Sequence, residues 1–182
     1  MESKLYTLKE TIGLIEKKKL LVIAGNDELL KQLPDGNWIG GCNPYMIDKN
    51  GGKCTTEHLI VKDFTESAVD FNFKTYTEND IKNVTTDAYD NSVIFVILPV
   101  FSKIHYEFAL YAPTFENQYL NPMIGWISGG TPENTAPGVA TAYVGNKRYT
   151  DRGVVLHMKL PDDKIGRVEI ISALEPDPIV MN

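Results

Sequence analysis

Residues 34–52 read PDGNWIGGCNPYMIDKNGG and combine a short strand signal, a glycine pair and a turn signal. Two large apolar residues, Trp38 and Ile39, run directly into Gly40-Gly41 and the cysteine Cys42. Paired glycines in or after a strand allow a positive φ angle, or let another group come close to the main chain. The stretch therefore predicts a strand whose end has a special role in the fold.

A second segment, residues 122–132 with the sequence PMIGWISGGTP, has the same ingredients. Each segment contains a tryptophan beside glycines, with a proline-containing loop before the strand. We therefore predict that the two segments meet and form a common pocket, one wall from each half of the chain. The candidate ligand-binding residues are Gly40, Gly41, Cys42, Tyr45, Trp126, Ser128, Gly129 and Gly130.

The chemistry of these residues suits a small anionic or zwitterionic molecule. Successive backbone N–H groups at a glycine turn can bind a carboxylate or a phosphate, and aromatic rings beside such a turn can enclose a ligand. A purely structural alternative stays open, in which the glycines permit tight bends and the aromatic rings belong to the core. Neither glycine pair has the pattern of a phosphate-binding loop or a dinucleotide fingerprint.

The order of the remaining signals predicts the fold class. Residues 20–64 and 92–159 each read as strand, helix, strand with glycines, and hairpin. The apolar run SVIFVILPV at 92–100 predicts a strand buried on both faces. We expect a single α/β (or α+β) domain over residues 1–182, internally duplicated, with mixed sheets flanked by helices. The proline-containing tail at 173–182 is expected to be mobile.

Local signals place the helices and turns. Thr7-x-x-Glu10 is a capping box before a helix, Asn26 can cap a second helix, and Ser102 can cap a third that runs through Ala112. The pair Gly145-Asn146 predicts a hairpin turn.

Composition and charge exclude several classes of protein. The chain of 182 residues has a formal net charge of −6, which argues against a nucleic-acid or anionic-membrane partner. No apolar run reaches the roughly 20 residues of a membrane helix, and the polar N-terminus carries no signal-peptide core. We therefore expect a cytoplasmic protein.

The cysteines and histidines predict neither a disulfide scaffold nor a metal site. Cys42 and Cys54 flank a turn, and reduced thiols are expected. The three histidines are scattered without ligand spacing, so we expect no metal, and no pattern indicates another cofactor.

The residues at 122–130 and 139–155, PMIGWISGG and VATAYVGNKRYTDRGVV, resemble the FIST sensory domain. The likeness covers roughly residues 20–172 and includes the Ile-Gly segment at 124–125, the turn at 143–146, Tyr149, Asp151 and Gly153. The run Ile39-Gly40-Gly41-Cys42 is similar to that family's first glycine segment. The resemblance implies a cytoplasmic module that binds a small molecule such as an amino acid and acts with a signalling protein partner.

A second hypothesis makes Cys42 the nucleophile of a hydrolase or transferase. The amides of the glycine turn and a histidine such as His58 or His105 would then activate its thiol. The alternative is a small buried thiol without chemistry. We therefore favour a binding module over an enzyme.

Overall fold

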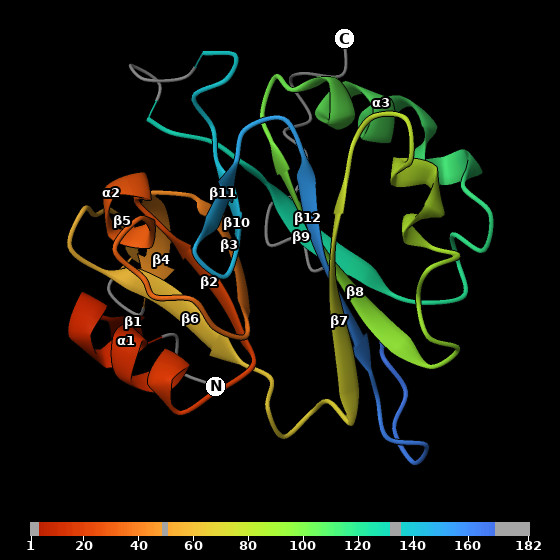
Figure 1. The fold of residues 1–182 in the computed structure, drawn as a ribbon, viewed down its shortest axis with the longest axis horizontal. Helices are drawn as coiled ribbons and strands as arrows, with labels where there is room; N and C mark the ends of the chain where they lie inside the picture. The colour runs from red at the N-terminus through yellow and green to blue at the C-terminus, as the bar shows by residue number, and fades with distance from the viewer. Residues whose placement is uncertain (1–3, 49–50, 132–135, 170–182) are drawn as a thin grey trace, which may run out of the picture.

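The structure, a computed structural model, describes residues 4–48, 51–131 and 136–169 and shows a mixed α/β architecture (Figure 1). The predicted fold class is confirmed. In the first part of the chain the elements are β1 (Leu5–Tyr6), α1 (Leu8–Glu16), β2 (Leu21–Gly25), α2 (Asp27–Leu30), β3 (Trp38–Cys42), β4 (Tyr45–Asp48), β5 (Gly51–Cys54), β6 (Leu59–Asp63) and β7 (Asp70–Tyr76). In the second part they are the 3-10 helix η1 (Ile81–Val84), β8 (Ser92–Pro99), α3 (Lys103–Tyr111), the 3-10 helix η2 (Ala112–Thr114), β9 (Met123–Ser128), β10 (Ala142–Val144), β11 (Lys147–Tyr149) and β12 (Gly153–Lys159).

Two mixed sheets and a hairpin contain these strands. The first sheet has the order β1-β6-β2-β3-β10-β11, the second has the order β7-β12-β8-β9, and β4 pairs with β5 alone. Each of the two larger sheets holds one parallel pair joined by a helical crossover, β2 with β3 and β8 with β9. The other pairings are antiparallel.

The two sheets pack face to face between outer layers of helices (Figure 1). Between the sheets, Val22 and Ile39 of the first meet Phe95 and Ile97 of the second. On its other face the first sheet carries a core with α1 and α2, and the second sheet carries a core with α3 and η1. The order of layers is therefore helix, sheet, sheet, helix.

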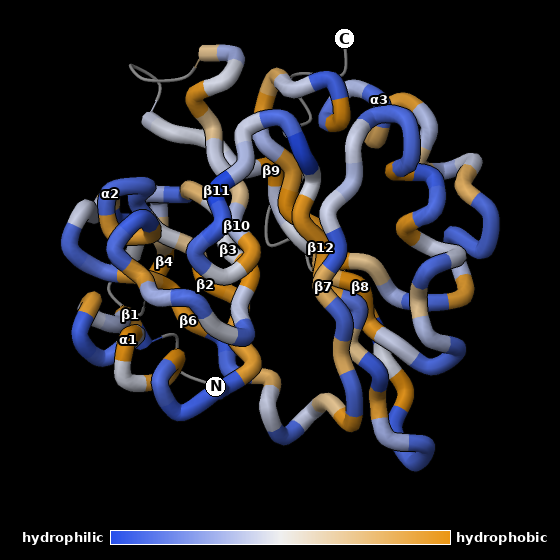
Figure 2. The backbone as a smooth tube through the Cα atoms, in the orientation of Figure 1, coloured by the Kyte–Doolittle hydropathy of each residue, from blue (hydrophilic) through white to orange (hydrophobic). Residues whose placement is uncertain are grey.

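The buried strand β8 has an apolar side chain on both faces, as its sequence predicts. Phe95 and Ile97 point into the core between the sheets, whereas Ile94, Val96 and Leu98 point toward α3. Side chains alternate along a strand, so a strand covered on both faces needs a continuous apolar run. Hydrophobic residues accordingly concentrate on the strands in the centre of the molecule (Figure 2).

The local helix and turn signals are also confirmed. Thr7 and Glu10 form the capping box of α1. Asn26 caps α2 through the N–H of Glu28, and Ser102 caps α3 through the N–H of His105. Gly145 adopts a φ of +53° in the turn between β10 and β11.

The predicted duplication stays a prediction, and the second half does not form a sheet of its own. Strands β10 and β11 come from residues 92–159 but join the first sheet, where β10 pairs with β3. The expected mobile tail at 173–182 lies outside the described residues.

Candidate functional site

The two glycine segments lie in contact, as the sequence predicts. The N–H of Gly129, just after β9, donates to the carbonyl oxygen of Cys42 at the end of β3, with an N–O distance of 3.0 Å. The N–H of Cys42 donates to the carbonyl oxygen of Thr141 at 3.1 Å, and the Ser128 hydroxyl donates to that same oxygen. The ends of β3 and β9 and the start of β10 therefore come together.

Gly40 and Gly41 lie inside β3, which is paired on one edge with β2 and on the other with β10. Their main chain therefore pairs within the sheet, and neither glycine is among the described residues that line the cavity presented below. A methyl group at Gly41 would lie 2.5 Å from Ile97 Cγ2 in the opposite sheet and 3.2 Å from Trp126 Nε1. A methyl group at Gly40 would lie 2.7 Å from the carbonyl oxygen of Ile23. The glycine pair lets neighbouring groups approach the main chain closely.

Three of the other predicted site residues lie away from the cavity described next. Trp126 is half-buried and packs against the core between the sheets. Ser128 is fully buried. Tyr45 lies in the hairpin strand β4 and is 48 % exposed. None of the three lines the charged cavity described next.

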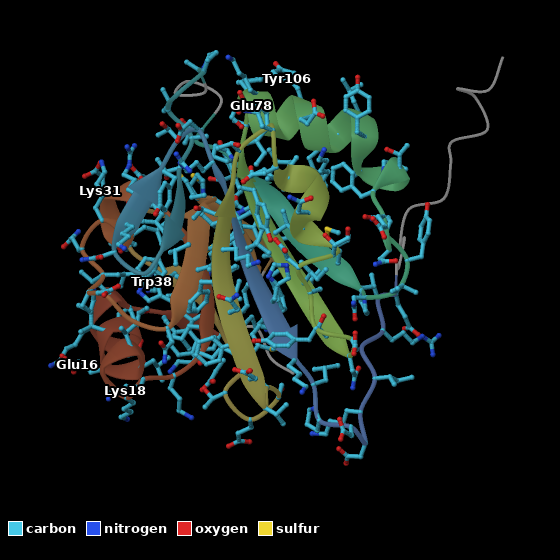
Figure 3. All side chains as sticks on the ribbon, turned by 45° about the vertical axis from the view of Figure 1, so that its right-hand side comes forward. Glu16, Lys18, Lys31, Trp38, Glu78 and Tyr106 are labelled. Atoms are coloured by element: carbon cyan, nitrogen blue, oxygen red, sulfur yellow. The ribbon has the colours of Figure 1, made fainter. Side chains whose placement is uncertain are left out.

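A cavity of about 380 Å³ opens where the carboxyl ends of β2 and β3 meet the start of β10. Of the predicted site residues, Cys42 and Gly130 line it. Four charged side chains line it as well: Asp27, Glu28, Lys31 and Arg148. Lys31 lies beside α2 at the edge of the molecule, whereas Trp38 lies inside (Figure 3). We call this space the charged cavity.

Asp27 makes hydrogen bonds and ion pairs with several residues in and beside the wall of the charged cavity. Its Oδ1 accepts hydrogen bonds from the Thr141 hydroxyl at 2.6 Å and from the Tyr143 hydroxyl at 2.5 Å. Its Oδ2 lies 3.0 Å from Lys31 Nζ and 3.6 Å from an Arg148 guanidinium nitrogen. Burial acts to raise the pKa of Asp27, but these hydrogen bonds, together with the positive charge of Arg148, hold it below its ordinary value. The Asp27 side chain is therefore a carboxylate at neutral pH.

The Asp27 carboxylate also contributes to a raised pKa of the Tyr143 hydroxyl. Burial first, and then the hydrogen bond to Asp27, raise the pKa of the Tyr143 hydroxyl, so it stays protonated and donates. Tyr143 also stacks on Trp38, with the ring centroids 5.9 Å apart. Tyr143 thus connects Asp27 in the cavity wall with the core beneath the first sheet.

Cys42 is a buried thiol, and its surroundings disfavour the thiolate. Burial raises the pKa of Cys42, and the Asp27 carboxylate adds to this rise, whereas the backbone N–H of Asp27, Arg148 and Lys31 partly oppose it. The thiol is therefore neutral at pH 7, and a neutral thiol is a poor nucleophile. Both Cys42 and Cys54 are free, as expected.

None of the three histidines lines the charged cavity, and each has a polar contact in another part of the structure. His58 faces the Thr55 hydroxyl at 3.5 Å, His105 accepts from the N–H of Phe101, and His157 meets the carbonyl oxygen of Val84. Among the described residues, no group of His, Cys, Asp or Glu side chains is arranged to hold a metal ion.

Sequence reasoning missed the charged residues of this cavity. Asp27 and Glu28 suit the first turn of a helix, where acidic residues complement the helix dipole. Nothing local indicates that Asp27 meets hydroxyl groups 114 and 116 residues further along the chain. Arg148 has no distinctive neighbours in the sequence, and its position on β11 becomes informative through the pairing of β10 with β3.

Comparisons with known proteins assign the chain to a family but identify no activity. No helix in the described part of the chain is long and apolar enough to cross a membrane. No curated protein and no solved structure matches the chain. Residues 6–180 match a family of unknown function, DUF6976. Because this match covers nearly the whole sequence, the chain belongs to the DUF6976 family.

Proposed function

We propose that this protein binds a small zwitterionic molecule in the charged cavity. The observation that carries the proposal is the presence of side chains of both signs around one cavity, Asp27 and Glu28 together with Lys31 and Arg148. A volume of about 380 Å³ is in the range of small-molecule sites.

The position of the cavity supports the proposal. Ligands of open α/β sheets bind in the crevice outside the carboxyl ends of parallel strands. The charged cavity lies at this end of β2 and β3, and residues of the loops that follow both strands, Asn26 and Pro44, line it. Loops carried on a rigid sheet are where binding residues gather.

Arg148 is the residue best suited to receive a negative group. A guanidinium has five N–H donors in a planar fork that fits a carboxylate. One of its nitrogens lies 3.6 Å from Asp27, and the side chain stays 40 % exposed toward solvent. Asp27 therefore orients Arg148 and leaves donors for a ligand.

Glu28 is suited to a positive group on the same ligand. Its side chain is 77 % exposed and contacts Lys31 at 2.6 Å. A ligand ammonium group would approach the Glu28 carboxylate, of which Oε1 accepts from Lys31, whereas both Asp27 oxygens already have donors or cations of the protein beside them. The charges are balanced, so a molecule with one charge of each sign fits better than an ion of either sign.

We assign this site to binding and not to covalent catalysis. The raised pKa of Cys42 opposes a nucleophilic role, so the hydrolase or transferase hypothesis gains no support. The resemblance to the FIST sensory domain, the signalling partner and the cytoplasmic location stay predictions from the sequence.

Thermal denaturation in the presence of single compounds tests the proposal. The panel consists of α-amino acids, together with carboxylic acids and amines that have the same side chain but lack one of the two charges. We expect at least one amino acid to raise Tm more than both of its singly charged analogues. A ligand at 100 times its Kd stabilises the folded state by about 2.7 kcal/mol, which is easily measured.

Two variants locate the site. Arg148→Gln removes the charge and should abolish the amino-acid shift, whereas Arg152→Gln changes an arginine in the turn before β12 that does not line the cavity. The control should keep the full shift. Equal shifts in both variants, or larger shifts with the singly charged analogues, would contradict the proposal.

A further inference from the structure

Strand β9 forms one edge of the second sheet and has a neighbouring strand on one side. The sheet order β7-β12-β8-β9 ends at β9, which pairs in parallel with β8 and with no other described strand. The carbonyl oxygens of Pro122 and Ser128 accept from N–H groups of β8 and of the residue just after it. Because main-chain directions alternate along a strand, Met123, Gly125 and Ile127 turn their N–H and C=O groups outward, away from β8.

The other edges of the two large sheets carry features that discourage pairing. In the described structure β1 has two residues, β11 has three residues that include Lys147 and Arg148, and β7 contains Asp70 and Lys74. Short length and charged side chains are means by which proteins keep an edge strand from adding a further strand. β9 has six residues, MIGWIS, with neither a charge nor a proline. It is therefore the edge best suited to pair with another strand.

The segment around β9 is uncharged as well. Residues 117–131, NQYLNPMIGWISGGT, contain no Asp, Glu, Lys, Arg or His, although 23% of the residues of the chain are charged. Ile124 and Ile127, whose side chains lie on opposite faces of the strand, are 38 % and 42 % exposed. A partner strand would cover apolar surface on both faces, which stabilises the pairing.

A second copy of β9 fits this edge. In an antiparallel pair about a two-fold axis at Gly125, Met123 lies opposite Ile127 of the partner copy, and Gly125 lies opposite its own copy. Opposed residues that direct their main-chain groups toward each other exchange two N–H···O bonds, so every outward group of these residues gains a partner. On the other register positions Ile124 lies opposite Trp126 of the partner copy, an aliphatic–aromatic pair that stabilises antiparallel strands.

The absence of charge favours an identical partner. In a two-fold interface each surface patch meets its own copy, so a charge near the axis faces a like charge. A chain with a net charge of −6 therefore pairs with itself best where its surface is uncharged, and residues 117–131 provide such a segment. A foreign strand selected by its charge would need acidic or basic side chains on this segment, and it has none.

We propose that the protein forms a two-fold symmetric dimer in which β9 pairs antiparallel with β9 of a second copy. The second sheets of the two copies then join into one continuous sheet in the order β7-β12-β8-β9-β9-β8-β12-β7. No residue of β9 is among the described residues that line the charged cavity, so the dimer does not depend on the ligand proposed above.

Sedimentation of the full chain over a series of protein concentrations tests the dimer, and we expect a monomer–dimer equilibrium. Ile127→Lys puts a charge beside Met123 of the partner copy, twice by symmetry, and should weaken dimerisation by at least about tenfold. Val69→Lys adds the same charge at an exposed position just before β7, at the other edge of this sheet, and should leave dimerisation unchanged. A monomer at every concentration, or equal dimerisation of the two variants, would overturn the proposal.

Amide exchange of the unsubstituted protein, followed by NMR at low and high protein concentration, tests the pairing itself. The N–H groups of Gly125 and Ile127 should exchange at least about tenfold more slowly at high concentration. Those of Ile124 and Trp126 face β8 and should be equally protected at both concentrations. Protection of Gly125 and Ile127 that does not change with concentration would mean that another part of the same chain pairs with β9. Fast exchange of these two amides in a dimer would place the interface elsewhere, and either result contradicts the proposal.

Discussion

At the scale of single residues, Asp27 and His157 show two opposite ways of placing a titratable group inside the protein. Asp27 has donors for both oxygens and stays charged. His157 is fully buried, its Nε2 faces the carbonyl oxygen of Val84 at 2.8 Å, and its Nδ1 has no partner in the described structure. Nε2 must carry a proton to donate to this carbonyl, and burial, which lowers the pKa of His157, disfavours a second proton on Nδ1. His157 is therefore neutral.

The protein should lose stability as the pH falls below about 6.5, the ordinary pKa of histidine. Burial lowers the pKa of His157, Lys74 acts in the same direction, and the hydrogen bond with Val84 and the charge of Asp87 oppose it. The unfolded chain then takes up a proton at a pH where the folded chain does not, so low pH favours unfolding. The contribution is largest above this pH and is lost below it.

Urea unfolding at pH 7.5 and at pH 5.5 measures this effect. We expect the wild-type free energy of unfolding to fall by about 1 kcal/mol more than that of His157→Gln over this interval. Gln keeps a donor for Val84 but cannot take up a proton. Equal pH dependence in the two proteins would contradict the assignment of the effect to His157.

At the scale of elements, capping determines where the helices begin. Thr7 Oγ1 accepts from the N–H of Glu10 at 3.3 Å, and the Glu10 carboxylate accepts from the N–H of Thr7 at 2.9 Å. These bonds satisfy donors that the first turn of a helix leaves free. Helix α1 has nine residues, and an isolated helix of that length is marginal in water. Its stability therefore depends on the cap and on packing against the first sheet.

Replacing the cap residue should destabilise the protein moderately. Thr7→Ala removes the side-chain acceptor, and we expect a loss of about 1 kcal/mol in the free energy of unfolding. Thr7→Ser keeps the hydroxyl and should cost much less. Chemical denaturation of both variants gives the comparison, and equal losses would show that the methyl group of Thr7, not its hydroxyl, matters.

At the scale of the whole molecule, two sheets share one core, and Gly41 sits where they touch. A methyl group there would lie 2.5 Å from Ile97 Cγ2 and 3.2 Å from Ser128 Cβ. Gly129, in the segment that meets it, has open space, because the nearest atom to an added methyl group would be Val100 Cγ1 at 3.7 Å. The two glycines therefore have different functions although their sequence contexts look alike.

This contrast predicts opposite tolerance to alanine. Gly41→Ala should lower the free energy of unfolding by about 1–3 kcal/mol, because an overpacked interface forces its neighbours to shift. Gly129→Ala should change it by less than about 0.5 kcal/mol, as usual for a site without close packing. Equal destabilisation by both substitutions would show that the sheets do not pack as tightly at Gly41 as described.

The sequence by itself determined the local parts of this protein. The capping residues Thr7, Asn26 and Ser102, the turn at Gly145 and the doubly buried strand at 92–99 follow from hydrogen bonds and steric limits that act over a few residues. Such effects are present in any chain with the same short segment. They therefore need no knowledge of the fold.

Tertiary structure alone decided which distant parts form the charged cavity. The sequence predicts that the glycine segments meet, and they do, but Gly40 and Gly41 serve the packing of the sheets, while Asp27 and Arg148 line the cavity. Asp27 meets Thr141 and Tyr143 because β10 leaves its own half of the chain and pairs with β3. The choice of strand partner depends on burying apolar faces across the whole molecule, and no short stretch of sequence contains that information.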